Sequence, residues 1–325
     1  MTVPSRRRLG LAAAALVLAA APAFAQTPSD KPLRVIVAGP AGGTGDIVAR
    51  LLAEGLGKEL NQPIVVDDKP GAGGVIAMND LLQSPREGST VLVSINAVVS
   101  EVPHIIKLKF DPSRELRPLA ELASTGIVMV GHPGLPAKNF AELIAYVKAR
   151  PGKVSYASYS AGTQSHVLGL QLNKAAGIDM AHIGYKGSPP ALADVMGGHV
   201  PLMFDGMPTS IPLIKSGKLK PYAVSLPARS AALPDVPTFA ELGYPQLEAR
   251  GWIGLWATPD MPAATQARLR DAALRIMANP SNRARLGEAG LEAGHPRTQD
   301  ELAKSLQADF ERIGAILKSI NFKPE

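Results

Sequence analysis

From Leu33 onward, the chain alternates short β-rich runs with amphipathic segments of about ten or more residues. The runs with strand character are Leu33–Ala38, Ile64–Val66, Thr90–Ser94, Ile127–Val130, Val154–Tyr159, Ala181–Tyr185, Val200–Phe204, Leu219–Leu226 and Trp252–Ala257. Strands that alternate with helices are typical of βαβ units. The pattern therefore predicts an α/β fold on a mostly parallel sheet.

Three helix starts can be predicted from capping pairs, in which an N-cap oxygen precedes an acidic residue by three positions. The N-cap residues are Asn139, Thr238 and Thr298. The last of these helices, over residues 298–320, repeats apolar residues at helical spacing. We expect this helix to pack with its apolar face on one lobe, that is, on one of the two compact halves expected for a chain of this length.

The N-terminus has the three parts of a secretory signal peptide. Arginines at positions 6–8 precede the apolar run Leu9–Ala21, and Ala23-Phe24-Ala25 is a cleavage site for signal peptidase. The alternative is a membrane anchor, but the apolar run is short and Pro22 interrupts it. We expect residues 1–25 to be removed and the mature chain to reach the periplasm without inserting into the membrane.

Composition narrows the classes of function. The chain has no Cys, which excludes disulfides, thiolate metal sites and Cys nucleophiles, and its six His residues form no metal-binding spacing. Its 34 Lys and Arg exceed its 28 Asp and Glu only slightly, and the basic residues are scattered. We therefore expect no metal and no nucleic-acid partner, and a small anion fits this charge.

A glycine-rich loop, Pro40-Ala41-Gly42-Gly43-Thr44-Gly45-Asp46, follows the first predicted strand and opens a helix. Its backbone N–H groups and the helix N-terminus favour an anion. A dinucleotide site is an alternative, but Val48 occupies the third glycine position of that fingerprint. A structural turn is the third possibility. No cofactor is expected.

A second junction of strand and helix contains Ser160, Ala161, Gly162, Thr163 and His166. Hydroxyl and N–H groups at such a junction can bind a carboxylate. The segment also approaches the nucleophile elbow G-x-S-x-G, although a serine stands at the first glycine position. An exported serine esterase or hydrolase that uses Ser160 is therefore the alternative function.

Three further residues follow predicted strands and are candidates for the same site. Asn96 could direct an amide toward the ligand, or be an ordinary turn residue. Lys186 could contribute charge, or be solvated. Asp205 could bind an ammonium group of the ligand, or brace its own loop through N–H groups. A glycine-rich turn at 69–74 also joins a strand to a helix.

The order of these motifs resembles that of the Bug family, the extracytoplasmic receptors of tripartite tricarboxylate transporters. The resemblance is carried by residues 38–50, 68–74, 183–191 and 233–238. It implies a two-lobed type II periplasmic-binding-protein fold, with two Rossmann-like domains joined by a two-strand hinge. It also implies a non-enzymatic receptor without a cofactor, whose partner is an integral-membrane transporter component.

The resemblance further implies that the loop at 40–46 and the turn at 160–163 hold a small carboxylate ligand. A di- or tricarboxylate, an amino acid or an aromatic acid would fit. Asp68-Lys69 departs from the Asn-Arg that is more frequent in the family. We expect a monomer, with residues 26–126 and 250–325 in lobe 1 and residues 127–249 in lobe 2.

Export is directly testable. If residues 1–25 are a signal peptide, N-terminal sequencing of the protein purified from the periplasm will begin at Gln26. A mature protein extracted from the membrane with an intact Met1 or Thr2 would contradict this.

Overall fold

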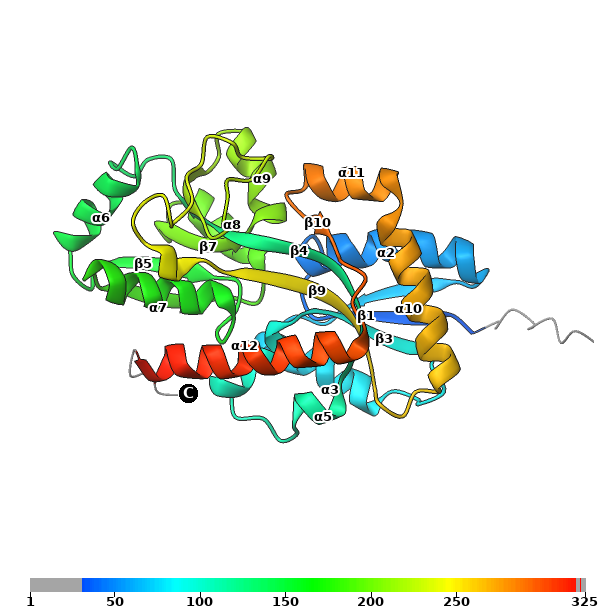
Figure 1. The fold of residues 1–325 in the computed structure, drawn as a ribbon. Helices are drawn as coiled ribbons and strands as arrows, with labels where there is room; N and C mark the ends of the chain where they lie inside the picture. Colours follow the sequence, from blue (N-terminus) through cyan, green and yellow to red (C-terminus); the bar gives the residue numbers. More distant parts are fainter. Residues whose placement is uncertain (1–30, 320–321, 323–325) are drawn as a thin grey trace, which may run out of the picture. The chain divides into compact units, whose positions relative to one another are not determined.

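A ten-stranded sheet runs through the part of the chain that the structure describes, and helices cover both of its faces (Figure 1). The structure is a computed structural model that describes residues 31–319 and residue 322. The predicted signal peptide, residues 1–25, lies outside the described residues.

The strands are β1 (Leu33–Val37), β2 (Ile64–Asp68), β3 (Thr90–Ile95), β4 (Arg117–Gly131), β5 (Val154–Ser158), β6 (Met180–Gly184), β7 (Leu202–Gly206), β8 (Lys220–Val224), β9 (Arg250–Ala257) and β10 (Glu292–Ala293). The helices are α2 (Thr44–Leu60), α3 (Val75–Gln83), α4 (Ala97–Ser100), α5 (Pro112–Glu115), α6 (Phe140–Lys148), α7 (Gln164–Ala176), α8 (Ser188–Met196), α9 (Met207–Lys215), α10 (Ala263–Ala278), α11 (Pro280–Glu288) and α12 (Gln299–Ser319). Short 3₁₀ helices are η1 (Ala72–Gly74), η2 (Val102–His104) and η3 (Pro245–Leu247).

The sheet is mixed, and the expectation of a mostly parallel sheet is wrong for its centre. Two parallel groups, β2-β1-β3 and β7-β5-β6, are joined by β9 and β4, which pair antiparallel with their neighbours. The βα units account for the parallel groups. The antiparallel strands arise where the chain crosses from one group to the other and returns.

β4 belongs to both halves of this two-lobed fold. It pairs with β9 up to Gly126, and from Ile127 it pairs with β7 and β8. β9 begins at Arg250 and returns the chain beside β3. This change of partner at residues 126–127 is consistent with the predicted lobe boundary. The full division, with residues 26–126 and 250–325 in lobe 1 and residues 127–249 in lobe 2, stays a prediction.

Alternating side chains of the strands supply a core on each face of the sheet. In the first half, Val35 and Val37 face α2 and α10, whereas Ile36 faces α3 and α12. In the second half, Tyr156 packs beneath α6 and α7, and Ala157 packs beneath α8 and α9. Each half of the sheet is thus enclosed by helices on both sides, which explains the almost continuous apolar runs of its strands.

Two of the three predicted helix starts are confirmed. Asn139 caps α6 by accepting a hydrogen bond from Glu142 N (2.9 Å), and Thr298 accepts one from Glu301 N (3.2 Å) ahead of α12. The capping pair at Thr238 also forms, with Glu241 N donating to Thr238 Oγ1 (3.1 Å), but turns follow it instead of an α-helix. Gly243 has a φ of +89° and Pro245 follows closely, so a helix cannot continue there.

The terminal helix α12 was expected to lie on one lobe. It instead contacts both halves of the fold. Leu302 and Leu306 pack in the first half with Ile36. About two to three turns later, Ile313 and Leu317 form a separate cluster with Val167 of α7. The apolar repeat was therefore interpreted correctly as a buried face, but its spacing could not indicate two separate partners.

Gly169 provides a test of the packing beneath α7. A Cβ at this position would overlap the ring of Tyr156, which is buried and donates a hydrogen bond to His166 O (3.1 Å). We expect Gly169→Ala to lower the free energy of unfolding by about 1–3 kcal/mol through overpacking. Urea unfolding followed by circular dichroism measures this change.

The matched control is Gly287→Ala in α11, where a Cβ meets no atom within 4 Å. This substitution should raise stability by about 0.5–1 kcal/mol because alanine favours the helix. A Gly169→Ala protein as stable as the wild type would show that the ring of Tyr156 can move aside.

Candidate functional site

A cavity of about 110 Å³, measured as the space open to the centres of water molecules, lies where strands of both halves end. This volume accommodates several waters or a small organic acid. Its lining includes Gly39, Pro40, Gly43, Thr44, Gly45, Gly71, Gly73, Gly74, Ser94, Asn96, Glu101, Tyr159, Ser160, Thr163, Gln164, Lys186, Gly187, Ser188, Gly206, Gly251 and Trp252. Segments that are far apart in the sequence therefore form a single site.

Five α-helices of nine or more residues begin at this cavity without a side-chain cap. The N-cap residues of α2, α3, α7, α8 and α9 all line it, and none accepts a capping hydrogen bond through its side chain. Helices α5, α6 and α11, which start elsewhere, have side-chain caps from Asp111, Asn139 and Asn279. N–H groups that no N-cap side chain satisfies, together with the helix dipoles, make the cavity favourable for an anion, although the N–H of Gln164 in α7 already faces Glu101.

The loop at 40–46 contributes only part of its predicted residues to the cavity. Pro40, Gly43 and Thr44 line it, whereas Ala41, Gly42 and Asp46 do not. Asp46 is buried, accepts a hydrogen bond from Gly42 N (2.8 Å) and pairs with Arg50 Nε (2.7 Å). Asp46 thus holds the loop in shape from behind.

The turn at 160–163 behaves similarly. Ser160 and Thr163 line the cavity, whereas Ala161 and Gly162 do not. Thr163 Oγ1 donates to Ser160 O (2.7 Å), and Gly73 N of the opposite half donates to Ser160 Oγ (3.1 Å). Ser160 therefore joins the two walls of the cavity directly.

His166 lies behind the cavity instead of lining it. Its ring stacks on His182 with centroids 3.7 Å apart, and His182 Nε2 is 2.7 Å from Ser158 Oγ. Burial lowers the pKa of His166 to about 3 and that of His182 to about 4, so both rings are neutral at pH 7. Among the described residues no histidine is bonded to Ser160, the nucleophile of the esterase alternative.

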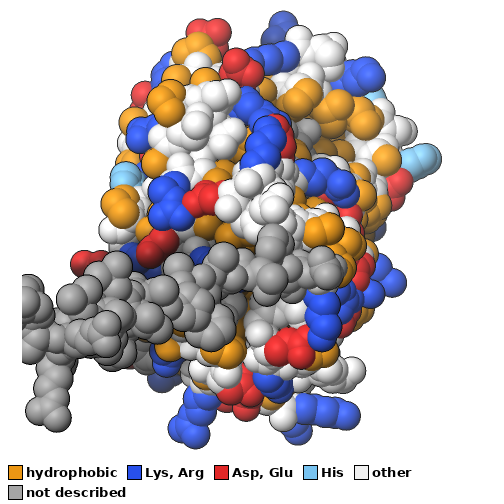
Figure 2. All heavy atoms as spheres, turned by 90° about the vertical axis from the view of Figure 1, so that its right-hand side faces the viewer, with side chains coloured by type: hydrophobic (Ala, Val, Ile, Leu, Met, Phe, Trp, Pro, Cys, Tyr) orange, Lys and Arg blue, Asp and Glu red, His pale blue; other side chains and the backbone are white. Residues whose placement is uncertain are grey.

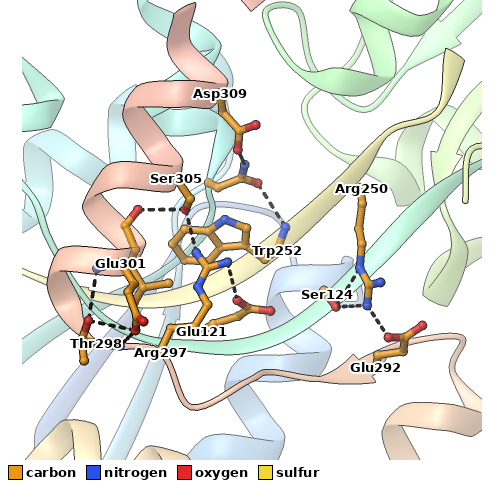
Figure 3. Close-up of polar contacts among 12 residues, drawn as sticks. Glu121, Ser124, Arg250, Trp252, Glu292, Arg297, Thr298, Glu301, Ser305 and Asp309 are labelled. Carbon is orange, nitrogen blue, oxygen red and sulfur yellow. Dashed lines mark hydrogen bonds and ion pairs between the residues drawn. The ribbon is translucent and has the colours of Figure 1, made fainter. Parts of the chain in front are cut away.

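The three isolated candidates have different surroundings. Lys186 lines the cavity, is exposed and forms no ion pair with the described residues. Asn96 lines it too, but its Oδ1 accepts from Trp252 N (3.1 Å) and its Nδ2 donates to Asp309 Oδ2 (3.3 Å) of α12 (Figure 3). The amide of Asn96 therefore fastens the cavity floor to β9 and α12.

Asp205 does not line the cavity. It is fully buried and accepts hydrogen bonds from Thr209 Oγ1 (2.6 Å) and Ser210 Oγ (2.7 Å) in α9. Burial raises its pKa, and the hydroxyl donors oppose that shift. Its geometry is that of a loop brace, the alternative that the sequence left open. A direct role for any of these residues in binding stays a prediction.

The sequence analysis missed several lining residues, above all Glu101, Tyr159 and Gln164. Glu101 is only 2 % exposed, and burial raises its pKa to about 8. No motif surrounds Glu101, so no sequence signal identified it. Tyr159 and Gln164 flank the turn at 160–163, so their position next to a predicted binding turn could have indicated that they line the cavity.

The surface around α2, α10 and α11 carries charges of both signs. Figure 2 shows Lys and Arg side chains interspersed with Asp and Glu on this face. Ion pairs such as Arg285–Glu54 and Arg275–Glu59 link these helices. Within the described ranges, no group of acidic, histidine or cysteine side chains is arranged to hold a metal ion. None of the helices described there is long and apolar enough to cross a membrane.

The buried His166 makes stability depend on pH. Its pKa in the folded state lies below the ordinary value of 6.5, so protons bind preferentially to the unfolded chain below pH 6.5. The free energy of unfolding should therefore fall between pH 6.5 and 4, by up to about 1.4 kcal/mol per pH unit for this histidine. Urea unfolding across this range measures the slope.

His166→Gln should flatten that slope, whereas His199→Gln, at an exposed position, should preserve it. Equal slopes in the wild type and the His166 variant would contradict a buried neutral imidazole.

Comparisons with known proteins agree with this architecture. A family model described as "Tripartite tricarboxylate transporter family receptor" matches residues 48–322. Protein BugT of Bordetella pertussis is 39 % identical over 246 residues, which cover 73 % of this chain and 74 % of BugT. Two solved structures are also similar.

MatC from Rhodopseudomonas palustris with bound malate is 28 % identical with a TM-score of 0.83, covering 88 % of this chain and 98 % of MatC. Rpa4515 from R. palustris with adipate is 26 % identical with a TM-score of 0.87, covering 90 % and 98 %. The match of the family model over most of the chain confirms the resemblance seen in the motifs. The chain belongs to the Bug family of tripartite tricarboxylate transporter receptors.

Proposed function

We propose that this protein is a periplasmic receptor that captures a small carboxylate in the cavity and presents it to the integral-membrane component of a tripartite tricarboxylate-type transporter. The observation that carries the proposal is the convergence of five uncapped helix N-termini on one cavity. The similar proteins MatC and Rpa4515, with malate and adipate, support a carboxylate ligand.

The energetics of such a site are sufficient for a receptor. A helix N-terminus stabilises an anion by up to about 2 kcal/mol, and a charge-assisted hydrogen bond contributes about 1.5–3 kcal/mol. Micromolar affinity corresponds to about −8 kcal/mol, and two helix N-termini with three charge-assisted hydrogen bonds supply up to about 13 kcal/mol before the desolvation of the carboxylate is subtracted. No buried arginine is required.

Binding should close the two lobes around the ligand. Contacts already join the two walls, since Gly73 N donates to Ser160 Oγ and Gly187 packs directly against Pro40. A ligand that touches both walls favours the closed form, because it gains its full interaction energy only there. The membrane component would then recognise the closed lobes of a monomeric receptor.

We propose binding without turnover. Ser160 Oγ accepts from Gly73 N and lies 3.3 Å from Ala161 O, whereas His182 of the buried histidine pair is bonded to Ser158. A serine nucleophile needs a histidine within hydrogen-bond reach to accept its proton. The surroundings of Ser160 favour a role in joining the lobes over the esterase alternative.

A pair of valine substitutions tests the cavity as the binding site. A Cβ at Gly39, which lines the cavity, meets no atom within 4 Å, so Gly39→Val should fold. We expect it to weaken carboxylate binding at least tenfold, because the added methyl groups occupy space beside the α2 N-terminus. Calorimetric titration against malate, adipate and a panel of other organic acids measures the affinities.

Ala41→Val is the matched control, because Ala41 is exposed in the same loop and does not line the cavity. It should bind like the wild type. Unchanged affinity in a folded Gly39→Val protein would place the site elsewhere, and hydrolysis of activated esters that Ser160→Ala abolishes would favour the enzyme.

A further inference from the structure

Glu101 is the one carboxyl side chain among the residues that line the cavity. It follows α4 and begins η2, and only 2 % of it is exposed. Its Oε2 is buried and has no hydrogen-bond partner among the described residues. A buried carboxyl oxygen without a donor is costly, so the position calls for a group that the protein itself does not supply.

The charges that face Glu101 do not neutralise it. From α12, Arg312 and Asp309 act on it with opposite signs, and they pair with each other at 2.9 Å. From the opposite wall, the backbone N–H of Gln164 and the Tyr159 side chain face it. Glu101 thus already occupies the N-terminus of α7, and none of the described basic side chains forms an ion pair with it.

Three helix N-termini and Lys186 lie along another part of the cavity lining, and the carboxylates of Asp46 and Asp205 lie behind it. A Cβ at Gly206 would lie 2.8 Å from Thr44 Oγ1, and Gly187 packs against Pro40, so the N-termini of α2, α8 and α9 meet there. Lys186 precedes Gly187 on the same lining. The cavity therefore combines an anion site on these helices with an acid at the wall formed by η2.

We propose that Glu101 binds an ammonium group of the ligand, so that the ligand is an amino carboxylic acid. This inference rests on the proposed function, because it assigns the ligand carboxylate to the N-termini of α2, α8 and α9. An ammonium group donates hydrogen bonds to Glu101 and neutralises its charge. A second carboxylate beside Glu101 has no proton to donate, so two negative charges would meet in a buried site unless Glu101 kept its own proton.

Matched ligands that differ only in an amino group provide the test. We expect the wild-type receptor to bind aspartate or glutamate at least tenfold more tightly than succinate or glutarate, respectively. Glu101→Gln keeps the size of the side chain but removes its charge, and should abolish this preference. The control Glu115→Gln, at an exposed position outside the cavity, should leave the preference unchanged.

The outcomes separate the two proposals. Tighter binding of succinate or glutarate than of its amino counterpart, with that affinity kept in Glu101→Gln, would overturn the ammonium assignment and leave the receptor intact. Failure of every carboxylate to bind the folded wild type would overturn the proposed function and this inference together.

A measurement on the wild type alone guards against misfolding of the Glu101 variant. Because burial raises the pKa of Glu101 to about 8, an ammonium group that binds the charged form of Glu101 should release up to about one proton per ligand at pH 7. Calorimetry in two buffers of different ionisation enthalpy counts these protons. No release, or proton uptake, would contradict the proposal.

Discussion

The antiparallel pairing of β4 with β9 is the constraint on which the rest of the structure depends. Their ladder runs from Arg117 opposite Ala257 to Gly126 opposite Arg250. Each of these strands also borders one half of the sheet, β9 through β3 and β4 through β7 and β8. Within residues 31–319, β4 and β9 are the two strands along which the chain passes between the halves. The helices that follow the parallel strands of both halves begin at the cavity beside this crossing.

Polar contacts fasten this crossing to the C-terminal segment. Arg250 donates to Ser124 Oγ and pairs with Glu292, while Arg297 pairs with the buried Glu121 and lies over the Trp252 ring (Figure 3). These contacts are on the lobe 1 side, and α12 then continues to α7. Any movement of one lobe relative to the other must therefore bend β4 and β9 near residues 126 and 250 and slide the end of α12.

Sequence reasoning succeeded where the signal was local. The strand runs and the glycine loops could be located because β-rich runs and uncapped strand–helix junctions are properties of a few consecutive residues. The first half of β4 was missed because its charged and polar residues, including Glu121, are buried by partners far away in the sequence. The capping pair at Thr238 led to a wrong prediction of a helix. A capping pair indicates only where a helix can start, and Gly243 and Pro245 prevented this one from continuing.

The candidate site shows the same division. The sequence predicted which loops meet, but not which atoms of each loop face inward. Asp46, His166 and Asp205 lie behind the cavity, and their direct role in binding stays a prediction. Glu101 could not be predicted, because a lone acid in a short turn is usually solvated. Only the packing of α12 and α7 against η2 makes it buried.

Buried polar atoms without a hydrogen-bond partner at the cavity wall lower the stability of the folded protein. Ser94 Oγ, Glu101 Oε2 and Trp252 Nε1 all belong to lining residues, and all lack a hydrogen-bond partner among the described residues. Each such group costs about 1–3 kcal/mol when buried, and a ligand regains this only if its own donors and acceptors match them. Under the proposed function, the helix N-termini would bind the carboxylate of almost any organic acid, so they would supply affinity without choosing among acids. The choice among acids would then depend on Ser94, Glu101 and Trp252. A ligand that does not match these groups leaves them without a hydrogen-bond partner.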